Sequence, residues 1–452
     1  MSRLWLGNFD FEHQLADPGY NRSAKMRALN AELSAHLLPL AATGDSVHLE
    51  KPLPDGFQQH AVDAGLLAPG VCTDFPPNES GRPWVVEPWG WSDAVVRDAQ
   101  QIGIQTTVPR AGPQTERPAR FEADPAKPTT RRLLAAAVER FHDWWYGTLA
   151  GKAAIANSRL YSCVMEGEYD AEVPGACGIF EFRDVEAAVR LAAKLWECRP
   201  SELRWIVKAN YGMSGRERIS GCGTQLNEAS ANWLRRRLKE DCLQFEPFVE
   251  CIEEVSSQWH LPQDFRQPPE LLGMTRVLCG HLGNFVPTAA IQDQLGGEYR
   301  ESIIETARLV ATEIHNWRYF GPLGIDAMVY DFPDGPQVRP IQDVNARWTM
   351  GRVLLEIGSR IGRDADLHWL HVPTDQLCRR LGLRREELSE FHARSSLDIT
   401  DRWSLQSQPD DDGLARINAL MDGSGQTRLF LTTPLWIGDQ PANRTSVLCE
   451  SK

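Results

Sequence analysis

A predicted β-hairpin in the second half of the chain constrains the fold more than any other feature. The first strand reads GIDAMVY at 324–330, and a turn containing Pro and Gly at 331–336 leads to the segment PIQDVNARWTMG at 340–351. Alternate side chains of a strand face the same side of its sheet. The second strand therefore directs Asp343, Asn345 and Arg347 to one face, which an ordinary core strand reserves for aliphatic residues.

Oxygen-bearing side chains gather on this face of the hairpin. Asp326 of the first strand is expected opposite or diagonal to Asp343 and Asn345. Two carboxylates and an amide oxygen form a hard site that suits Mg²⁺, or Mn²⁺, held jointly with substrate phosphates. Without a cation the carboxylates would repel each other at close range. The alternative is a solvated polar face of an edge hairpin with a chance ion pair.

Cationic side chains lie near this set and upstream of it. Arg347 could neutralise a transferring phosphoryl group or an oxyanion, or it could pair with Asp343. Lys208 ends the strand-like run RWIVK and precedes the loop YGMSGR at 211–216. Glycine lets a backbone close on phosphate oxygens because no Cβ stands in the way. A strand, a lysine and such a loop are typical of a polyphosphate site, although turns containing glycine are also common without one.

A third segment, QFEPFVECIEEVS at 244–256, has an acid before an apolar stretch and further acids about seven residues later. A main-chain segment with apolar neighbours can pair with the edge of an adenine ring, and a carboxylate further on can accept the ribose hydroxyls. Taken alone, the segment fits a surface strand and turn equally well.

The chain is expected to divide into three parts. Short apolar segments at 3–7 and 83–87 alternate with helical patterns at 24–40 and 92–102, which predicts a small α/β lobe with a parallel sheet. Residues 108–130 are rich in Pro and charge, as a lobe boundary would be. The predicted parts are an N-terminal α/β lobe at 1–125, a core at 126–352, and a C-terminal helical extension and tail at 353–452.

Within the core and the extension, helical and extended patterns alternate. Helices are predicted at 184–196, 228–239, 301–315, 353–361, 374–381 and 386–395, and strands at 204–208, 242–249, 255–261 and 273–278.

Composition excludes several classes of protein. The 452 residues are 42% hydrophobic and carry a formal charge of −13, which predicts a globular protein that does not bind nucleic acid through its phosphates. The chain lacks both a positively charged leader and an apolar run of the ~20 residues that span a bilayer, so we expect a cytoplasmic protein with no membrane partner. The ten cysteines show no CxxC pair and are expected to be reduced.

The order of these motifs resembles the ATP-grasp superfamily over about residues 153–351. The family's second hairpin strand ends Glu-x-Asn-Pro-Arg, whereas this chain has Asp343, Val344, Asn345, Ala346 and Arg347 and therefore lacks the Pro and has a shorter acid. The segment ANSRL at 156–160 is similar to the family's Asn-x-Lys segment, and MTRVL at 274–278 is similar to its Arg-bearing strand beside the acceptor site.

The resemblance implies a role for each candidate residue. Those expected to bind ATP are Lys208 and Arg159 at the α- and β-phosphates, Ser214 and Gly215 over the β- and γ-phosphates, Glu246 and Val249 at the adenine hinge, and either Glu253 or Glu254 at the ribose. Those expected at the reaction centre are Asp326, Asp343 and Asn345 as Mg²⁺ ligands, and Arg347, with Arg276, beside the acyl phosphate.

The resemblance further implies an ATP-grasp fold, in which an α/β lobe precedes two α+β subdomains that close over ATP and Mg²⁺. The implied reaction activates a carboxylate as an acyl phosphate, which an amine attacks to form an amide or peptide bond with release of ADP and phosphate. Small carboxylates and amines are the expected substrates, and a homodimer is left open. The alternatives are transfer to a hydroxyl, a thiol or bicarbonate, and a nucleotide-sensing protein without catalysis.

Overall fold

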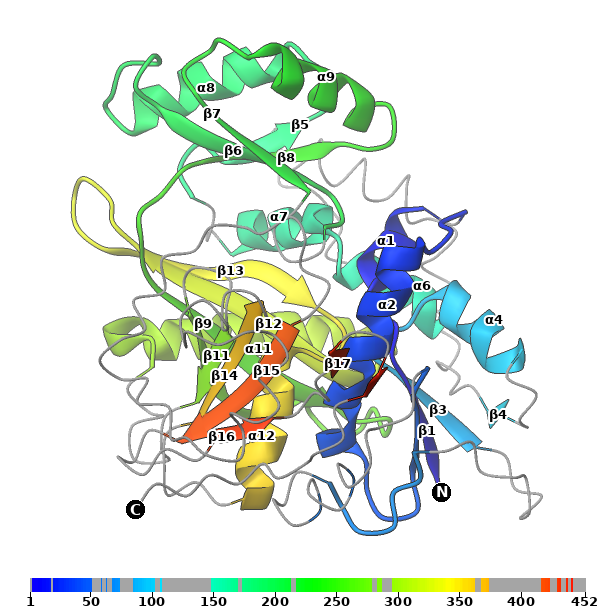
Figure 1. The fold of residues 1–452 in the computed structure, drawn as a ribbon. Helices are drawn as coiled ribbons and strands as arrows, with labels where there is room; N and C mark the ends of the chain where they lie inside the picture. The colour runs from blue at the N-terminus through cyan, green and yellow to red at the C-terminus, as the bar shows by residue number, and fades with distance from the viewer. Residues whose placement is uncertain are drawn as a thin grey trace.

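The structure is a computed structural model, and its described residues form three bodies (Figure 1). They are residues 2–17, 19–50, 58, 62, 67–73, 84–101, 106–107, 148–169, 173–212, 217–278, 283–286, 295–361, 367–373, 416–422, 429–431, 436–437 and 440–441. The bodies are an N-terminal lobe, a small sheet covered by helices, and a large sheet. The predicted lobe boundary at 108–130 lies outside the described residues.

The N-terminal lobe has the predicted parallel sheet. Its strands run in the order β2-β1-β3-β4, and all of their pairings are parallel. The predicted helix at 24–40 divides into an α-helix and a 3₁₀ helix, because Pro39 lacks the N–H that a continuous α-helix needs. The elements are β1 (Arg3–Leu6), α1 (Phe11–Ala16), α2 (Ala24–Leu33), η1 (Ser34–Leu40), β2 (Ser46–His48), β3 (Trp84–Pro88), α4 (Asp93–Gln101) and β4 (Thr106–Thr107).

The small sheet is antiparallel and has one face covered by helices. Its strands run in the order β5-β8-β6-β7, and α8 and α9 lie above it in Figure 1. Trp205, Val207 and Phe245 pack against these helices, so the alternating residues of β6 and β8 point to the opposite face. The elements are β5 (Cys177–Ile179), α8 (Asp184–Leu195), β6 (Arg204–Ala209), β7 (Arg218–Cys222), α9 (Glu228–Arg237) and β8 (Leu243–Pro247).

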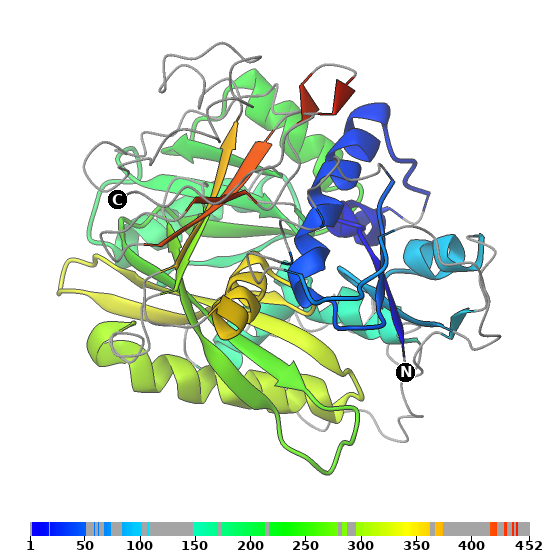
Figure 2. The same ribbon diagram turned by 60° about the horizontal axis from the view of Figure 1, so that its bottom comes forward.

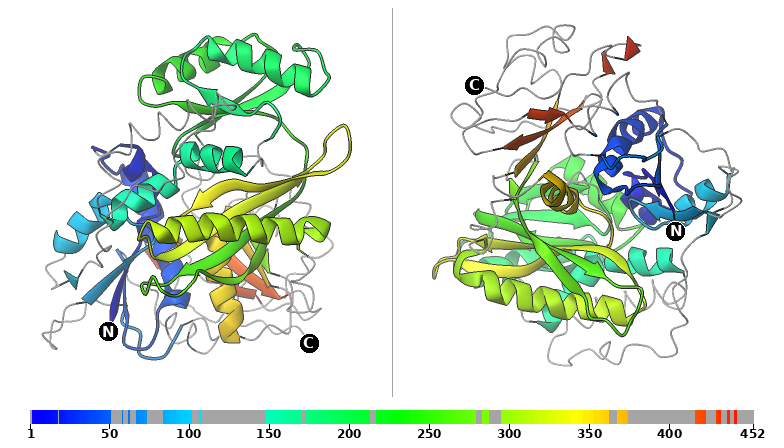
Figure 3. Two further views of the ribbon diagram at one scale, coloured as in Figure 1. Left: turned by 180° about the vertical axis from the view of Figure 1, so that it is seen from behind. Right: turned by 90° about the horizontal axis from the view of Figure 1, so that it is seen from below.

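The large sheet is antiparallel throughout, with its described strands in the order β13-β12-β9-β10-β11-β14-β15-β16. Helix α11 lies across one face (Figure 3, left). Val255, Met274 and Ala327 pack there against Ile303 of this helix. The elements up to the hairpin are β9 (Cys251–Leu261), β10 (Glu270–Leu278), β11 (Gly283–Val286), η2 (Gly297–Tyr299), α11 (Arg300–Asn316), β12 (Gly321–Tyr330) and β13 (Gln337–Asn345).

The C-terminal part differs from the helical extension that the sequence predicts. Helix α12 (Met350–Ile361) forms as expected, and in Figure 2 it lies between the large sheet and the N-terminal lobe. The next described segments are strands that extend the large sheet: β14 (Leu367–Pro373), β15 (Arg416–Asp422) and β16 (Leu429–Leu431), with β17 (Trp436–Ile437) and β18 (Gln440–Pro441) pairing separately. Apolar β-branched and aromatic residues in these strands favour sheet. The helices predicted at 374–381 and 386–395 lie outside the described residues.

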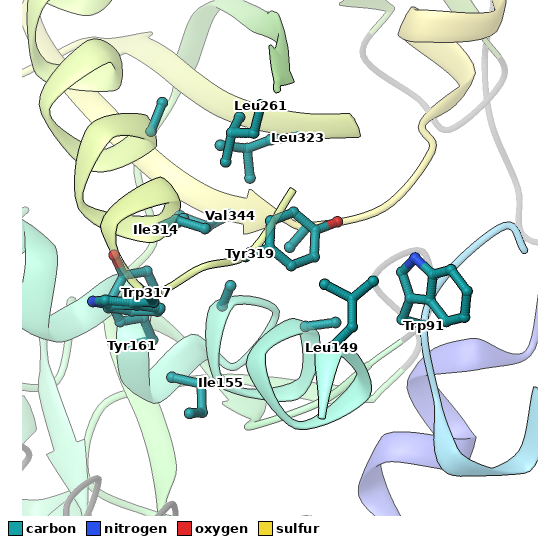
Figure 4. Close-up of a cluster of buried hydrophobic side chains, with 14 of the residues drawn as sticks. Trp91, Leu149, Ile155, Tyr161, Leu261, Ile314, Trp317, Tyr319, Leu323 and Val344 are labelled. Carbon is teal, nitrogen blue, oxygen red and sulfur yellow. The ribbon is translucent and has the colours of Figure 1, made fainter. Parts of the chain in front are cut away.

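Two helices connect the bodies through a common hydrophobic core. Helix α6 (Leu149–Ala156) lies beside the N-terminal lobe, and helix α7 (Arg159–Glu168) lies between the small sheet and β13 of the large sheet. Figure 4 shows Trp91 of the lobe near Leu149 of α6, and Tyr161 of α7 against Trp317, which follows α11. The rings of Tyr161 and Trp317 meet edge to face, with centroids 4.8 Å apart. This core fixes the start of α7 relative to the hairpin.

The order of the bodies is the one that the ATP-grasp resemblance implies, namely a parallel α/β lobe followed by two antiparallel sheets with helices. The predicted strands and helices within the core form close to their expected bounds. None of the described helices combines the length and the apolar character needed to traverse a bilayer.

Candidate functional site

The hairpin of β12 and β13 brings the predicted acidic residues together. Asp326 pairs directly with Asp343, and Gly324 pairs with Asn345. Asn345 is also joined to Asp326, because its Nδ2 donates to Asp326 Oδ2 at 3.0 Å. The alternate residue Val344 is buried in the hydrophobic core. The three oxygen-bearing side chains therefore share one face of the sheet, as the alternation predicts.

Burial and like charge act together on this acidic pair. Burial, together with the negative charges of Asp343 and Glu254, raises the pKa of Asp326 to about 7, against the lowering effect of Ser256 and Arg347. Within the described residues, no group of three or more His, Cys, Asp and Glu side chains is placed to hold a metal ion. The acidic pair therefore needs other ligands, such as the amide oxygen and phosphate oxygens, to complete the shell of a cation.

Arg347 joins the hairpin to the N-terminal lobe. Its Nη2 donates to Asn345 Oδ1 at 2.9 Å and lies 2.8 Å from Oε1 of Glu12 in α1. Its Nη1 donates to the carbonyl oxygen of Trp348 at 3.0 Å. Arg347 is thus next to the acidic pair, but its carboxylate partner is Glu12 and not Asp343. No pattern in the sequence indicates this contact, because Glu12 lies in another lobe.

Arg159 reaches the acidic pair from the start of α7. Its Nη2 lies 3.5 Å from Asp343 Oδ2, and its Nη1 donates to the carbonyl oxygen of Ala209 at 3.0 Å. The Ser158 hydroxyl caps the helix by accepting from the Tyr161 N–H at 3.1 Å. Gly212 opens the glycine loop close by, since a Cβ there would come within 3.2 Å of Arg159 Nη1. Ser214 and Gly215 lie outside the described residues.

Lys208 belongs to the face of the small sheet that α8 and α9 leave uncovered. It is opposite Gln244 of β8 and Arg218 of β7. Its Nζ donates to both oxygens of Glu246, at 2.8 and 2.7 Å. Burial lowers the pKa of Lys208, although the carboxylate of Glu246 acts to raise it.

Glu246 is the last residue but one of β8, directly before the connection that carries Val249. It is buried, and besides Lys208 it accepts from Nη2 of Arg339 at 3.1 Å. Arg339 also forms an ion pair with Glu166 of α7. Burial alone would raise the pKa of Glu246, but Arg339 and Lys208 outweigh it and hold the pKa below its ordinary value. Two cations therefore hold Glu246 in this structure, and its assignment to the adenine hinge stays a prediction.

The sequence analysis does not single out Arg339 and Glu166, although strand and helix periodicity point to both. Arg339 precedes Asp343 by four positions on the same strand, so alternation places both on one face. Glu166 follows Arg159 by two helical turns, so both belong to one face of α7.

The two candidate ribose acids, Glu253 and Glu254, are on opposite faces of the large sheet. Glu254 is opposite Met328, on the same face of the sheet as Asp326, and it interacts with Gln342, Lys208 and Asp343. Burial raises the pKa of Glu254. Glu253 is on the opposite face, which α11 covers.

Arg276 is also on that covered face, contrary to its expected place at the acyl phosphate. It pairs with Val255 in the sheet and donates from Nη2 to Glu253 Oε1 at 2.6 Å. Both Arg276 and Glu253 are therefore separated from the acidic pair by the sheet itself. Val249 is in the connection from β8 to β9 and packs beside Met328 and Tyr330.

The two sheets thus turn these polar faces toward each other. The contact between Arg339 of β13 and Glu246 of β8 joins the two faces, and Arg159 approaches Asp343 from α7. The side chains brought together are Arg159, Lys208, Glu246, Glu254, Asp326, Asp343, Asn345 and Arg347.

Comparisons with known proteins give similarity in structure but not in sequence. No family model matches the chain, and no curated protein matches it. Among solved structures, an N5-carboxyaminoimidazole synthetase from Staphylococcus aureus complexed with ADP has a TM-score of 0.43 at 10% identity, covering 87% of this chain and 88% of that one. The biotin carboxylase domain of a Hydrogenobacter thermophilus 2-oxoglutarate carboxylase, in complex with MgADP and bicarbonate, has a TM-score of 0.41 at 14% identity, covering 82% and 75%.

A D-alanyl-alanine synthetase A from Vibrio cholerae is similar over a smaller part of the chain. Its TM-score is 0.33 at 12% identity, covering 47% of this chain and 63% of that one. Similarities of this size do not assign an activity or a substrate. A functional interpretation of the chain must therefore come from its own site.

Proposed function

We propose that the protein is an ATP- and Mg²⁺-dependent ligase that activates a carboxylate as an acyl phosphate for attack by an amine. One observation carries the proposal. Arg159 approaches the pair Asp326 and Asp343 from helix α7, 3.5 Å from Asp343, and Lys208 is on the polar face of the small sheet. Cations on one side and paired carboxylates on the other are what a metal-bound polyphosphate requires.

The acidic pair fits a divalent cation held jointly with phosphates. Asp326 has a raised pKa partly because Asp343 is opposite it, so a cation between them would relieve the repulsion. Asn345 Oδ1 accepts from Arg347 but retains a second lone pair for a metal. Mn²⁺ would be accepted by the same oxygen ligands. The metal, when bound, would neutralise phosphate oxygens during transfer.

The remaining residues are assigned to the nucleotide from their positions. Lys208 and Arg159 would hold the α- and β-phosphates, and the loop with Ser214 and Gly215 would cover the β- and γ-phosphates. Glu254 is preferred over Glu253 for the ribose because only Glu254 is on the face of the acidic pair. Val249 would contact the adenine from the connection between the sheets.

The chemical steps use Arg347 as the cation nearest to the acyl group. A substrate carboxylate oxygen attacks the γ-phosphorus, and the bond to the β-phosphate oxygen breaks to release ADP. The amine nitrogen then attacks the acyl carbon, phosphate departs, and the nitrogen loses a proton. Arg347 would stabilise the oxyanion, and its contact with Glu12 would orient the guanidinium. Arg276 has no part in these steps.

A Mg²⁺-dependent assay of ADP release tests the proposal. The protein would be incubated with ATP and pools of amino acids and small carboxylates, with and without amine acceptors. We expect ADP release from at least one pool, only in the presence of Mg²⁺ or Mn²⁺. ATP binding without turnover on any pool would contradict the ligase and favour a nucleotide sensor.

A further inference from the structure

Four charged side chains form a buried row that crosses from α7 to the small sheet. In order they are Glu166 of α7, Arg339 of β13, Glu246 of β8 and Lys208 of β6, so that negative and positive charges alternate. The side chains of Glu166 and Arg339 are each only 1% exposed. We refer to these four residues as the buried charge row.

Two cations of the buried charge row donate hydrogen bonds to the carboxylate of Glu246. Arg339 Nη2 donates to its Oε1 at 3.1 Å, and Lys208 Nζ donates to both of its oxygens. Arg339 in turn is shared with Glu166, which its Nε contacts. A buried charge is tolerated when it is paired, and removal of one partner leaves the other uncompensated. The strength of the ion pair between Lys208 and Glu246 therefore depends on how far Arg339 already neutralises the charge of Glu246.

A lysine that binds phosphate must first leave its carboxylate. When Lys208 moves to a phosphate oxygen, Glu246 keeps its negative charge inside the protein, with Arg339 as its remaining cationic partner within the described residues. Glu166 competes with Glu246 for the same guanidinium. Arg339 thus favours the release of Lys208, and Glu166 opposes it.

We infer that Arg339 and Glu166 are positioning residues that set, in opposite directions, how readily Lys208 leaves Glu246 for the phosphates of ATP. The inference rests on the proposed function, because it takes Lys208 as a phosphate ligand. The inference predicts opposite changes in ATP affinity for the two residues, which a loss of packing alone would not produce. Loss of Arg339 should weaken ATP binding, whereas neutralisation of Glu166 should strengthen it.

The protonation of Glu166 adds a dependence on pH. Burial raises the pKa of Glu166 to about 7, although Arg339 acts to lower it. The charged and titratable groups that face Glu166 are Arg339 of β13, Glu246 of β8, Lys208 of β6, Tyr330 of β12 and Cys163 of its own helix. Below the pKa of Glu166, the wild-type side chain is already neutral. The Glu166→Gln variant should therefore differ from the wild type above this pKa and resemble it below.

Calorimetric titration with MgATP at about pH 8 and about pH 6 tests the inference. At the higher pH, Arg339→Met should weaken ATP binding about tenfold or more, the size of one charge-assisted hydrogen bond. Arg339→Lys should recover part of this loss because it restores the positive charge. Glu166→Gln should bind ATP several-fold more tightly than the wild type at the higher pH and equally at the lower pH.

A matched control is the exposed ion pair of Arg190 and Glu186 on α8, whose side chains are 63% and 58% exposed. Arg190→Met and Glu186→Gln should leave ATP affinity unchanged at both pH values. Circular dichroism would establish that each variant is folded. If Arg339→Met does not fold, Glu166→Gln decides the question alone.

Two results would overturn the inference. One is a Glu166→Gln protein that binds ATP as the wild type does, or more weakly, at the higher pH. The other is an Arg339→Met protein that folds and keeps wild-type affinity. In either case, a loss of ATP affinity in Lys208→Met would show that the proposed ATP site stands and that only the positioning role fails. An unchanged affinity in Lys208→Met would refute both.

Discussion

At the scale of single residues, the proposed site depends most on Asp343. Its side chain is 28% exposed, is opposite Asp326 in the hairpin, and has Arg159 at 3.5 Å. The family pattern that the segment resembles has a Glu here, which is longer by one methylene. The shorter acid is supported by its surroundings, because Asp326 and Asn345 are on the same face and Arg159 approaches from α7.

The first prediction concerns this carboxylate. Asp343→Ala should abolish Mg²⁺-dependent ADP release, because it removes one of the two acidic ligands, while the protein remains folded. The matched control is Asp334→Ala, since Asp334 is exposed in the turn of the same hairpin. Steady-state ADP release and circular dichroism would check both variants. Activity in Asp343→Ala equal to that of the control would refute the metal assignment.

The second prediction concerns pH. The pKa of Asp326 is raised to about 7, so the folded protein binds a proton that the unfolded chain releases at lower pH. The contribution of Asp326 to stability is therefore full below the unfolded pKa of about 4 and is lost as the pH rises through about 7. Mg²⁺ should then raise the melting temperature more at pH 8 than at pH 6. An equal rise at both pH values, or the same pH dependence in Asp326→Asn, would contradict this.

At the scale of elements, the start of α7 and the hairpin of β12 and β13 position most of the side chains of the proposed site. Ser158 caps α7, accepting from Tyr161 N–H and donating to the carbonyl oxygen of Ile155 at 2.8 Å. The backbone N–H of Arg159 donates to the carbonyl oxygen of Asn210 at 3.0 Å, directly after β6. One helix terminus thus places Arg159 between Lys208 and the acidic pair.

The third prediction compares two helix caps. Ser158→Ala should cost about 1 kcal/mol of stability and also weaken ATP binding, because the capped turn carries Arg159. Asn227 caps the outer helix α9 by accepting from Ser230 N–H at 2.8 Å, so Asn227→Ala should cost a similar amount without changing ATP affinity. Chemical denaturation and calorimetry would measure the two effects. Equal ATP affinities in the two variants would remove α7 from the site.

Alternation along strands explains why much of the site could be read from the sequence. The period of two places Asp343 and Asn345 on one face, and the turn at 331–336 makes the pairing with Asp326 foreseeable. The same period does not indicate which face of β9 a helix will cover. The sequence alone therefore does not distinguish Glu253 from Glu254 as the ribose acid. Arg276 was misplaced for the same reason, because its face is set by the packing of α11.

At the scale of the whole molecule, the N-terminal lobe and the large sheet meet at Arg347. The N-terminal lobe supplies Glu12, and the rings of Trp5 and Trp348 have centroids 5.3 Å apart just beyond it. Such contacts join residues more than three hundred positions apart, for which the sequence has no local signal. The C-terminal strands of the large sheet were missed for a similar reason, since their register depends on β11.

The fourth prediction tests the contact of the lobe with Arg347. Glu12→Gln should lower the turnover number about tenfold, the size of one charge-assisted hydrogen bond, because Arg347 loses its anionic partner. The affinity for ATP should stay the same, since Glu12 pairs with Arg347 and, among the described residues, with none that is assigned to the nucleotide. Glu50→Gln is the control, because Glu50 forms an ion pair with Arg22 in the same lobe. A fall in ATP affinity equal to the fall in turnover would contradict the division of roles.

The central claim is that ATP binds with its phosphates between Lys208 and the pair Asp326 and Asp343. Calorimetric titration with ATP, with and without Mg²⁺, tests this most directly. The account predicts that the wild-type protein binds ATP, more tightly with Mg²⁺, and that Lys208→Met binds it about tenfold or more weakly. A Lys208→Met protein with the dissociation constant of the wild type, or wild-type binding that does not respond to Mg²⁺, would contradict it.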